Sequence, residues 1–473
     1  MRLTIIFTCL VCLLSACSPE QNASLVSFGK IARTPTAEHP QEIVVVTYAA
    51  PNTYYLNADN AYAGLEYDLA QLFSTKYAPE YRVKFLVVDN IADVMPALLS
   101  GKADIAAAGL PMLKPFQYPV KFSAPYYETR QQLVYNKAMN DKPNGLDHIK
   151  NAHIVLPAEA NYAGNFHRLT TANNAQHWQV DEQSTAEVLL TKVATGKLDY
   201  TIASAHLVNM MQNFYPNLQE ALPVGKAEKI AWVFSPKADT RLIKKVNGYF
   251  ASIKKDGHLR NILDRYHGHS ERLAESDVRL FIERIDTILP EYKTLFKKAA
   301  AQTGLNWRLL AALSYRESHW DTNNTSPTNV RGMMMLTENT AEAMGVTDRL
   351  DPKQSIPAGA QYILQLKSMF PKTIPEPDRT YFALAAYNIG FSHVQDARAL
   401  AKRQKLNPNS WADIKHSLVL LSDPQYYNTT KYGYASGGAP IVLVETVRSY
   451  QRILEKYEPS AAQVLSGAFM AAK

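Results

Sequence analysis

Strand-forming patterns fill the first half of this 473-residue chain and nearly vanish after about residue 270. Before that point short β-branched runs, for example at residues 43–48 and 200–203, alternate with amphipathic stretches. This alternation predicts an α/β fold with mainly parallel sheets. After a polar stretch at residues 267–276, amphipathic segments follow one another without strands and predict an all-α region. Since a domain usually holds about 100–200 residues, we expect an α/β domain at residues 41–268 and an all-α domain at residues 269–473.

Several short polar residues mark expected helix boundaries in the all-α region. Ser276 is expected to cap its first helix and Asn306 a later one, because their side chains can accept a hydrogen bond from the free N–H groups of a first turn. A further helix is expected to begin just after Asp378 and to stop near Gly390.

The beginning of the chain has the pattern of a secretory leader. Arg2 precedes an apolar run at residues 3–14, which is too short to be expected to span a bilayer. The run ends in Leu-Ser-Ala-Cys at residues 14–17, which resembles the lipobox of bacterial lipoproteins. In proteins of that kind the chain is cut before the cysteine, which is then acylated.

This resemblance implies a signal peptide at residues 1–16 and a lipid-anchored tether at residues 17–40, with Cys17 as the lipidation site. Ser18 in place of Asp implies the periplasmic face of the outer membrane, whose lipid would then be a partner. The alternatives are simple secretion with an incidental Cys17, or peripheral attachment to the membrane.

The formal net charge of +7 is spread along the chain without a concentrated basic block. A nucleic-acid-binding protein would need such a block, so we exclude nucleic acid as a partner. A mildly basic protein suits an anionic partner such as cell-wall polymer or a membrane surface. The sequence contains no HExxH, Walker or GxSxG pattern, and residues 321–326 begin like a calcium loop that lacks its later Gly and Glu. We therefore expect no metal and no cofactor.

One carboxyl group occupies a position where it would be poorly solvated. Leu309, Leu310 and Leu313 share one face of the helix predicted after Asn306. Glu317 follows four residues later and joins that face. Burial raises the pKa of a carboxyl group, and a carboxyl that stays partly protonated near neutral pH can protonate a glycosidic oxygen. Taken alone, the pattern equally allows a carboxylate that is paired with a neighbouring Arg or solvated at the helix end.

Three short motifs stand in order in the all-α region. They are Glu-Ser-His-Trp-Asp at residues 317–321, Ser-Pro-Thr-Asn-Val-Arg-Gly-Met-Met-Met-Leu-Thr at residues 326–337 and Ala-Tyr-Asn-Ile-Gly at residues 386–390. Together they resemble the motifs of the soluble lytic transglycosylase superfamily, which shares its core with goose-type lysozyme. The chain departs from the common pattern at Thr322, where most members have Pro, and at residues 333–335, where most have a Gln.

The resemblance implies a lysozyme-like domain that cleaves peptidoglycan glycan strands. Glu317, the family's catalytic glutamate, would protonate the oxygen between N-acetylmuramic acid and N-acetylglucosamine. It would then take the proton from the muramic C6 hydroxyl, which attacks the anomeric carbon and closes a 1,6-anhydro ring. Ordinary glycosidases use two carboxyl groups, but here the nucleophile belongs to the substrate. The residues expected to bind substrate are Ser318, Met333, Met335, Tyr387, Asn388 and Tyr450, with structural packing as the alternative for each.

Two other functions stay open at this point. A goose-type lysozyme-like hydrolase would use the same fold but consume water. A non-catalytic cell-wall receptor would hold glycan without cleaving it, although such a protein has no need of a buried acid.

The N-terminal domain carries Gly-Leu-Glu-Tyr-Asp at residues 64–68, which resembles the signature of family 3 solute-binding proteins. The resemblance implies a periplasmic-binding-protein-like domain whose two α/β lobes close around a ligand. The residues expected at the ligand cleft are Tyr54, Glu66, Asp68 and Tyr126.

The usual amino-acid clamps are missing from this domain. Residues 110–119 contain no Arg to pair a ligand carboxylate, and Ser204 stands where an Asp would bind the ammonium group. We therefore expect a wall-derived peptide, or no ligand, in place of a free amino acid. The domain is expected to regulate the lytic domain to which it is fused.

Overall fold

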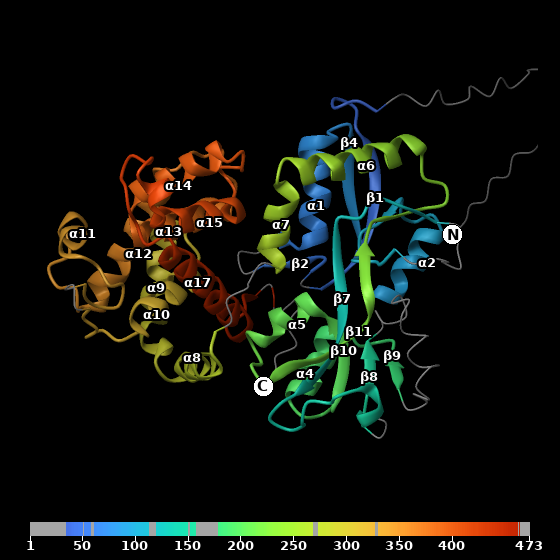
Figure 1. The fold of residues 1–473 in the computed structure, drawn as a ribbon, viewed down its shortest axis with the longest axis horizontal. Coiled ribbons are helices and arrows are strands. Elements are labelled where there is room, and N and C mark those ends of the chain that lie inside the picture. The colour runs from blue at the N-terminus through green and yellow to red at the C-terminus, as the bar shows by residue number, and fades with distance from the viewer. Residues whose placement is uncertain are drawn as a thin grey trace, which may run out of the picture.

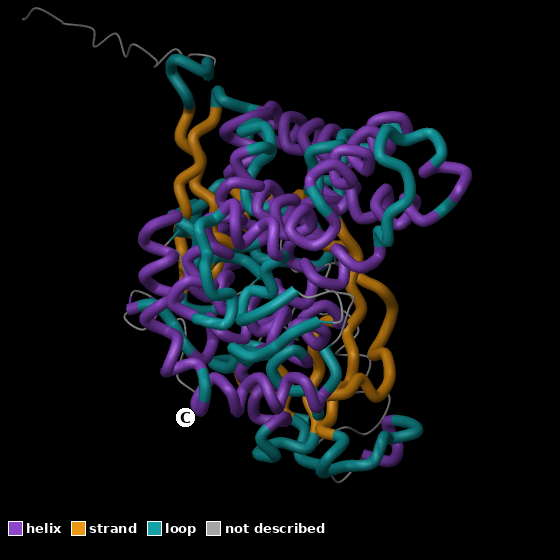
Figure 2. Tube along the Cα trace, turned by 90° about the vertical axis from the view of Figure 1, so that its left-hand side faces the viewer, coloured by secondary structure: helices purple, strands orange, loops and turns teal. Residues whose placement is uncertain are grey.

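The computed structural model describes residues 35–50, 52–57, 61–112, 120–149, 152–157, 178–267, 273–326, 330–461 and 463. Within these residues an α/β part is followed by a helical part, which confirms the predicted fold class (Figure 1). The two parts lie side by side, and in the side view the helical part stands in front of the strands (Figure 2). The expected signal peptide and Cys17 lie outside the described residues.

The first lobe is built on a five-stranded sheet with the order β4-β1-β5-β12-β6. Strand β1 runs parallel to β4 and β5, whereas β12 is antiparallel to both of its neighbours. Val45 and Val46 on β1 point to opposite faces and are both fully buried, because helices cover both sides of the sheet. The elements of this lobe are β1 Gln41–Tyr48, β2 Tyr55–Leu56, β3 Tyr62–Ala63, α1 Leu65–Leu72, β4 Tyr81–Val88, α2 Val94–Leu99, β5 Ile105–Ala106, β6 Lys121–Phe122, β12 Val233–Phe234, α6 Thr240–Lys255 and α7 His258–His267.

The second lobe contradicts the prediction of mainly parallel sheets. Its three-stranded sheet has the order β10-β7-β11, and β7 is antiparallel to both neighbours. The long strands β7 and β11 run between the lobes (Figure 1). Pro223 and Gly225 interrupt the alternation of β11, which is why the sequence pattern missed it. The elements are β7 Tyr127–Asn136, β8 Val155–Pro157, β9 Gln179–Asp181, α4 Ala186–Ala194, β10 Tyr200–Ser204, α5 Ala205–Gln212 and β11 Leu218–Ile230.

The helical part packs around the buried helix α10. Asn306 caps α10 as predicted, whereas α8 begins at Glu275 after Ala274, so the prediction that Ser276 caps it is wrong. Its helices are α8 Glu275–Thr287, α9 Leu289–Thr303, α10 Trp307–Ser318, α11 Glu338–Ala343, α12 Pro352–Ser368, α13 Asp378–Ile389, α14 Phe391–Arg403, α15 Trp411–Val419, α16 Pro424–Tyr427 and α17 Gly438–Tyr457. Short 3-10 segments lie at Ile91–Asp93, Leu146–Ile149 and Leu420–Ser422, and a π-helical turn at Phe73–Tyr77.

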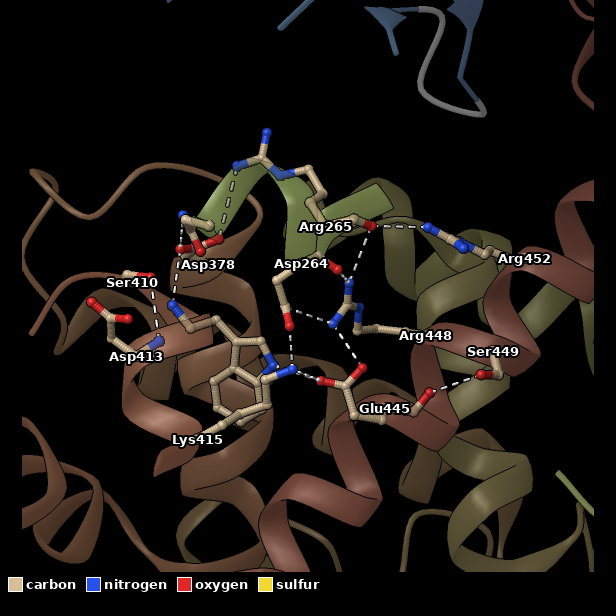
Figure 3. Close-up of polar contacts among 12 residues, drawn as sticks. Asp264, Arg265, Asp378, Ser410, Asp413, Lys415, Glu445, Arg448, Ser449 and Arg452 are labelled. Atoms are coloured by element: carbon tan, nitrogen blue, oxygen red, sulfur yellow. Dashed lines mark hydrogen bonds and ion pairs between the residues drawn. The ribbon is translucent and has the colours of Figure 1, made fainter. Parts of the chain in front are cut away.

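A network of buried charges joins the two parts through α7 (Figure 3). Lys415 lies 2.5 Å from Asp264 and 3.2 Å from Glu445. Arg448 lies 2.7 Å from Glu445 and 3.5 Å from Asp264. The network also includes pairs between Arg260 and Asp413 and between Arg265 and Asp378. Four cations therefore pair with four carboxylates at and beside the interface, so the buried charges of this network have partners of opposite sign.

The C-terminal end of α7 is capped by the helical part. The Nη2 atoms of Arg448 and Arg452 donate to the Arg265 carbonyl at 3.3 and 3.0 Å. Cations are favoured at the carboxyl end of a helix, where free carbonyls carry partial negative charge. Helix α17 therefore holds α7, and with it the first lobe, in one docked position.

The second lobe also contacts α17. The Lys456 ammonium donates to the Tyr215 hydroxyl at 3.0 Å and lies over the rings of Phe214 and Tyr215, 4.7 and 4.3 Å from their centroids. One helix of the helical part thus touches both lobes of the N-terminal domain.

Candidate active site

Helix α10 places Glu317 at the end of a buried segment. The Asn306 side chain accepts a hydrogen bond from the Arg308 N–H at 2.8 Å and so fixes the start of the helix. Every residue from Leu309 to Leu313 is buried. Glu317 follows one turn later and is only partly buried, so its carboxyl group lies where the core meets the surface.

The chain turns sharply just after Glu317. His319 and Trp320 both have left-handed backbone conformations, with φ values of 55° and 60°, which non-glycine residues rarely adopt. The Trp320 ring is buried, and its Nε1–H donates to the Ala311 carbonyl at 2.8 Å. This anchor stabilises the turn and ends α10 directly behind the carboxyl group.

The Glu317 carboxyl group has no protein partner within the described part of the chain, where it neither accepts a hydrogen bond nor forms an ion pair. Burial raises its pKa to about 7, and the Arg316 guanidinium opposes this increase more weakly. Burial and the charge of Glu317 raise the pKa of Tyr387 well above its usual value, so the phenol lies within electrostatic range of the carboxyl group. Near neutral pH, Glu317 is therefore protonated in a substantial fraction of molecules.

The second motif forms a tight loop that is fastened to α10. The Met333 carbonyl accepts hydrogen bonds from the hydroxyls of Ser314 and Ser318 at 3.0 and 2.9 Å. Gly332 has a φ of 77°, and a Cβ atom there would lie 1.8 Å from the Arg349 carbonyl oxygen. The loop can therefore approach this closely only with glycine at that position.

The third motif closes the site from α13. The Tyr387 hydroxyl donates to the Met334 carbonyl, and its ring lies 5.5 Å from that of Tyr362. Asn388 is the next residue and is exposed, and Met335 in the facing loop is partly exposed. The three motifs therefore come together around Glu317, with an amide and a thioether on the accessible side.

The structure divides the residues expected to bind substrate into two groups. The Ser318 hydroxyl is engaged by backbone carbonyls, and Met333 is fully buried, so neither side chain faces a groove. Tyr450 is buried too, with its ring 4.3 Å from Phe281 and 4.9 Å from Tyr315. These three differ from the expectation because packing consumes their contact surfaces. The residues that do reach the surface or Glu317 are Met335, Tyr387 and Asn388.

Sequence reasoning missed several residues that hold the second-motif loop. Ser314 could have been found, since it lies four residues before Ser318 on the same helix face. Ser355 accepts from the Met334 N–H at 3.3 Å, and Arg349 donates to the Leu336 carbonyl at 3.1 Å. Neither of the last two has a local sequence signal.

In the N-terminal domain, Glu66 lies in the core of the first lobe. Its carboxylate accepts hydrogen bonds from the Gly109 N–H and the Trp232 Nε1–H, both at 2.9 Å, and from the Tyr126 hydroxyl. Burial raises the pKa of Glu66, and these three donors oppose that increase. Glu66 and Tyr126 therefore tie together the roots of the strands that connect the lobes, which differs from the expected role at an open cleft.

Asp68 and Tyr54 lie elsewhere on the same lobe. The Asp68 carboxylate accepts from Arg265 at 2.7 Å and from the Tyr266 hydroxyl at 2.8 Å, so it faces α7 and the domain interface. The Tyr54 ring lies 4.9 Å from that of Tyr62. Its role at a ligand cleft stays a prediction, whereas Asp68 differs from its expected role because α7 engages its carboxylate.

No three His, Cys, Asp or Glu side chains converge as a metal site among the described residues. The groups that the three motifs bring to the site are the Glu317 carboxyl group, the Tyr387 phenol and the Asn388 amide.

Comparisons with known proteins match both parts of the chain. Residues 42–269 match the family described as bacterial extracellular solute-binding proteins, family 3, and residues 294–409 match the family described as the transglycosylase SLT domain. A protein of Methylobacillus flagellatus named membrane-bound lytic murein transglycosylase F is 49% identical over 97% of this chain and 95% of its own. A protein of the same name from Nitrosospira multiformis is 43% identical over 88% of this chain and 86% of its own.

Among solved structures, a putative L-cystine ABC transporter protein from Listeria monocytogenes aligns with 49% of this chain and 98% of its own, with 20% identity and a TM-score of 0.44.

The raised pKa of Glu317 predicts a pH-dependent difference in stability. The folded state holds its proton up to about pH 7, above the ordinary carboxyl value of 4.5, so folding favours the protonated form. The contribution of Glu317 to the stability of the wild type should therefore fall as pH rises through this window, whereas Gln at this position has no charge to bury. The free energy of unfolding of the variant, relative to that of the wild type, should increase by on the order of 3 kcal/mol between about pH 4 and pH 8.

Urea unfolding of both proteins at the two pH values measures this gain. Glu338→Gln, which changes an exposed glutamate on α11, serves as the control and should show no comparable change. An equal response of the two variants would contradict the assigned environment of Glu317.

Proposed function

The chain belongs to the membrane-bound lytic murein transglycosylase F family, and we propose that Glu317 is the residue that performs its reaction. It is a peptidoglycan lytic transglycosylase with an N-terminal solute-binding-like domain. The observation that carries the proposal is the partly buried Glu317 carboxyl group, which has a pKa of about 7 and no partner among the described residues, where the three motifs meet.

The reaction needs one group that first gives and then takes a proton. Protonated Glu317 donates to the glycosidic oxygen between N-acetylmuramic acid and N-acetylglucosamine, and the bond from that oxygen to the muramic anomeric carbon breaks. The Glu317 carboxylate then removes the proton from the muramic C6 hydroxyl, whose oxygen bonds to the anomeric carbon. The proton returns to Glu317, no water is consumed, and the new end is a 1,6-anhydro sugar. A pKa near the working pH suits both steps.

A lone carboxyl group favours this reaction over hydrolysis by two carboxyl groups. The causes that shift the pKa of Glu317 are burial and Arg316, with no second carboxylate among them. Asp321, the other acid of the first motif, accepts from the Asn323 N–H at 2.9 Å and so shapes the turn. A hydrolase with a general base opposite Glu317 would need a second carboxylate about 6.5–9.5 Å away, and among the described residues no carboxylate contributes to the pKa shift of Glu317.

Substrate contacts at the site follow from exposure. Asn388 carries an amide that matches the acetamido groups of both sugars, and Met335 offers an adaptable apolar surface. Tyr387 interacts electrostatically with Glu317 and is fixed by its bond to Met334, which suits it to a place at the edge of the site. Ser318 and Met333 do not contact substrate in this proposal. The hydrogen bond between the Ser318 hydroxyl and the Met333 carbonyl holds the loop that carries Met335.

Membrane association is supported by the relatives named membrane-bound. None of the described helices has both the length and the apolar character needed to cross a bilayer. We propose that an acylated Cys17 anchors the protein to the periplasmic face of the outer membrane, on the strength of Leu14-Ser15-Ala16-Cys17. Several acyl chains on one cysteine suffice for stable anchoring.

The N-terminal domain is proposed to regulate the lytic domain in response to wall-derived peptides. Helix α17 contacts the first lobe through Arg448 and the second lobe through Lys456. A change in the angle between the lobes cannot keep both contacts, so a ligand that favours one lobe arrangement must move or release α17. The effect is limited by the difference in affinity for the two arrangements, typically about 1–3 kcal/mol.

Replacement of the catalytic acid should abolish turnover without loss of folding. Glu317→Gln keeps the shape of the side chain but can neither give nor take the proton, so we expect digestion of purified sacculi to fall by about 10⁴-fold or more. Mass spectrometry of wild-type products should show ends one water lighter than hydrolytic ends. Glu338→Gln is the matched control and should digest normally. Clear turnover by a folded Glu317→Gln protein would contradict the assignment.

Loss of the proposed lipid site should release the protein from the membrane. Cys17→Ser removes the thiol that would be acylated, so we expect no incorporation of labelled palmitate and recovery in the soluble fraction. The matched control is Ser18→Thr, which leaves the cysteine in place. A Cys17→Ser protein that still fractionates with the outer membrane would point to peripheral attachment.

The contact between Lys456 and the second lobe should be needed for regulation. Lys456→Met removes the ammonium that binds Tyr215 but keeps most of the apolar stem. We expect basal sacculus digestion to persist and its response to added wall peptides to disappear. Lys402→Met changes an exposed lysine of α14 and should leave the response intact. A normal response in the Lys456→Met protein would exclude this contact as the route.

A further inference from the structure

Two tyrosines stand out on the surface of the lytic domain, in the loop between α16 and α17. Tyr432 and Tyr434 are 46% and 62% exposed. Water can hydrogen-bond to the hydroxyl of a Tyr side chain but leaves the apolar face of the ring unfavourably exposed. Such rings are common at binding surfaces.

The loop that carries these rings is firmly held. Asp396 on α14 is buried, and its carboxylate accepts hydrogen bonds from the Lys431 and Tyr432 N–H groups at 3.1 and 2.8 Å. A buried carboxylate is costly unless it is hydrogen-bonded, so this pairing strongly specifies the loop conformation. A Cβ atom on Gly437 would lie 1.6 Å from the Leu418 carbonyl oxygen, which shows how closely the loop is packed at its end.

The position of the loop connects it to the catalytic site. The Tyr432 ring lies 6.4 Å from His393, in the first turn of α14. That turn begins directly after the third motif, whose exposed Asn388 faces the substrate in the proposed reaction. Tyr432 therefore packs against the start of the helix that directly follows the third motif, five residues along the chain from Asn388.

The second tyrosine and a lysine complete the surface. Tyr427 packs edge-on against Tyr434 at 5.7 Å, which supports the exposed ring from behind. The Lys431 ammonium lies 5.1 Å from the centre of the Tyr432 ring. The surface thus combines two supported aromatic faces with one cation.

We propose that Tyr432 and Tyr434 form a glycan-binding subsite of the lytic domain, beyond the sugars that flank the cleaved bond. The inference rests on the proposed function, because that function supplies a polymer long enough to reach it. The apolar C–H faces of amino sugars fit aromatic rings, their hydroxyls can bond the phenol groups, and Lys431 suits the carboxylates of the peptide stems. Rings that are already held in place bind without the entropic loss of ordering a loop.

The subsite is tested by sedimentation of intact sacculi with the full chain in the Glu317→Gln background, which prevents digestion during the assay. Tyr432→Ala and Tyr434→Ala should each weaken binding roughly tenfold, as expected for truncation of an aromatic anchor. Tyr432→Phe should retain most of the binding because it keeps the ring. Tyr62→Ala removes an exposed tyrosine of the N-terminal domain and should bind as before.

Thermal melting of each variant separates a lost contact from a lost fold. Unchanged binding by both alanine variants, with unchanged melting, would overturn the subsite, and so would equal losses in Tyr432→Phe and Tyr432→Ala. If the melting temperature falls for the alanine variants, Tyr432→Phe and Lys431→Met decide the question. The proposal is contradicted if Lys431→Met binds sacculi with unaltered affinity while Tyr432→Phe binds them more weakly. A wrong catalytic assignment would show itself in a different measurement, because the Glu317→Gln single variant would then still digest sacculi.

Discussion

The partly buried Glu317 carboxyl group is the constraint on which the lytic site depends. Leaving such a group without a partner is unfavourable for folding, and the site contains several devices that maintain it. Asn306 and the apolar run after it fix α10, Trp320 secures the turn behind it, and the Met333 carbonyl binds the second-motif loop to the same helix. The stability given up at one carboxyl group is thus offset by packing and hydrogen bonds around it.

The sequence predicted the fold class, which depends on local periodicity, and it indicated the family through three motifs that keep their order. It predicted the Asn306 cap for the same reason. It did not predict that Ser318 would bind a backbone carbonyl or that Met333 would be buried, since both depend on how a distant loop folds back onto α10. The sequence did not predict the antiparallel pairing of β7 with β10 and β11 either, because strand direction is set by connections across the lobes.

The charge network between the domains could not be read from the sequence for a similar reason. Asp264 and Lys415 are far apart along the chain, and each resembles an ordinary surface charge until α7 docks. A buried network adds little net stability compared with apolar packing, but it is satisfied in only one arrangement. Its contribution is therefore to specify how the lobes are seated on the lytic domain, as the proposed regulation requires.

Helix α17 links this interface to the catalytic helix. Arg448 holds α7 from one side of α17, and Tyr450, two residues later, packs 4.9 Å from Tyr315 on α10. Tyr315 lies two residues before Glu317. A helix moves as a stiff unit, so displacement of α17 by the lobes would repack Tyr450 against α10. The carboxyl group is sensitive to such a change, because its pKa is set by burial and would fall if the packing around it opened. In the proposed regulation, lobe movement would therefore alter the protonation of Glu317 as well as access to it.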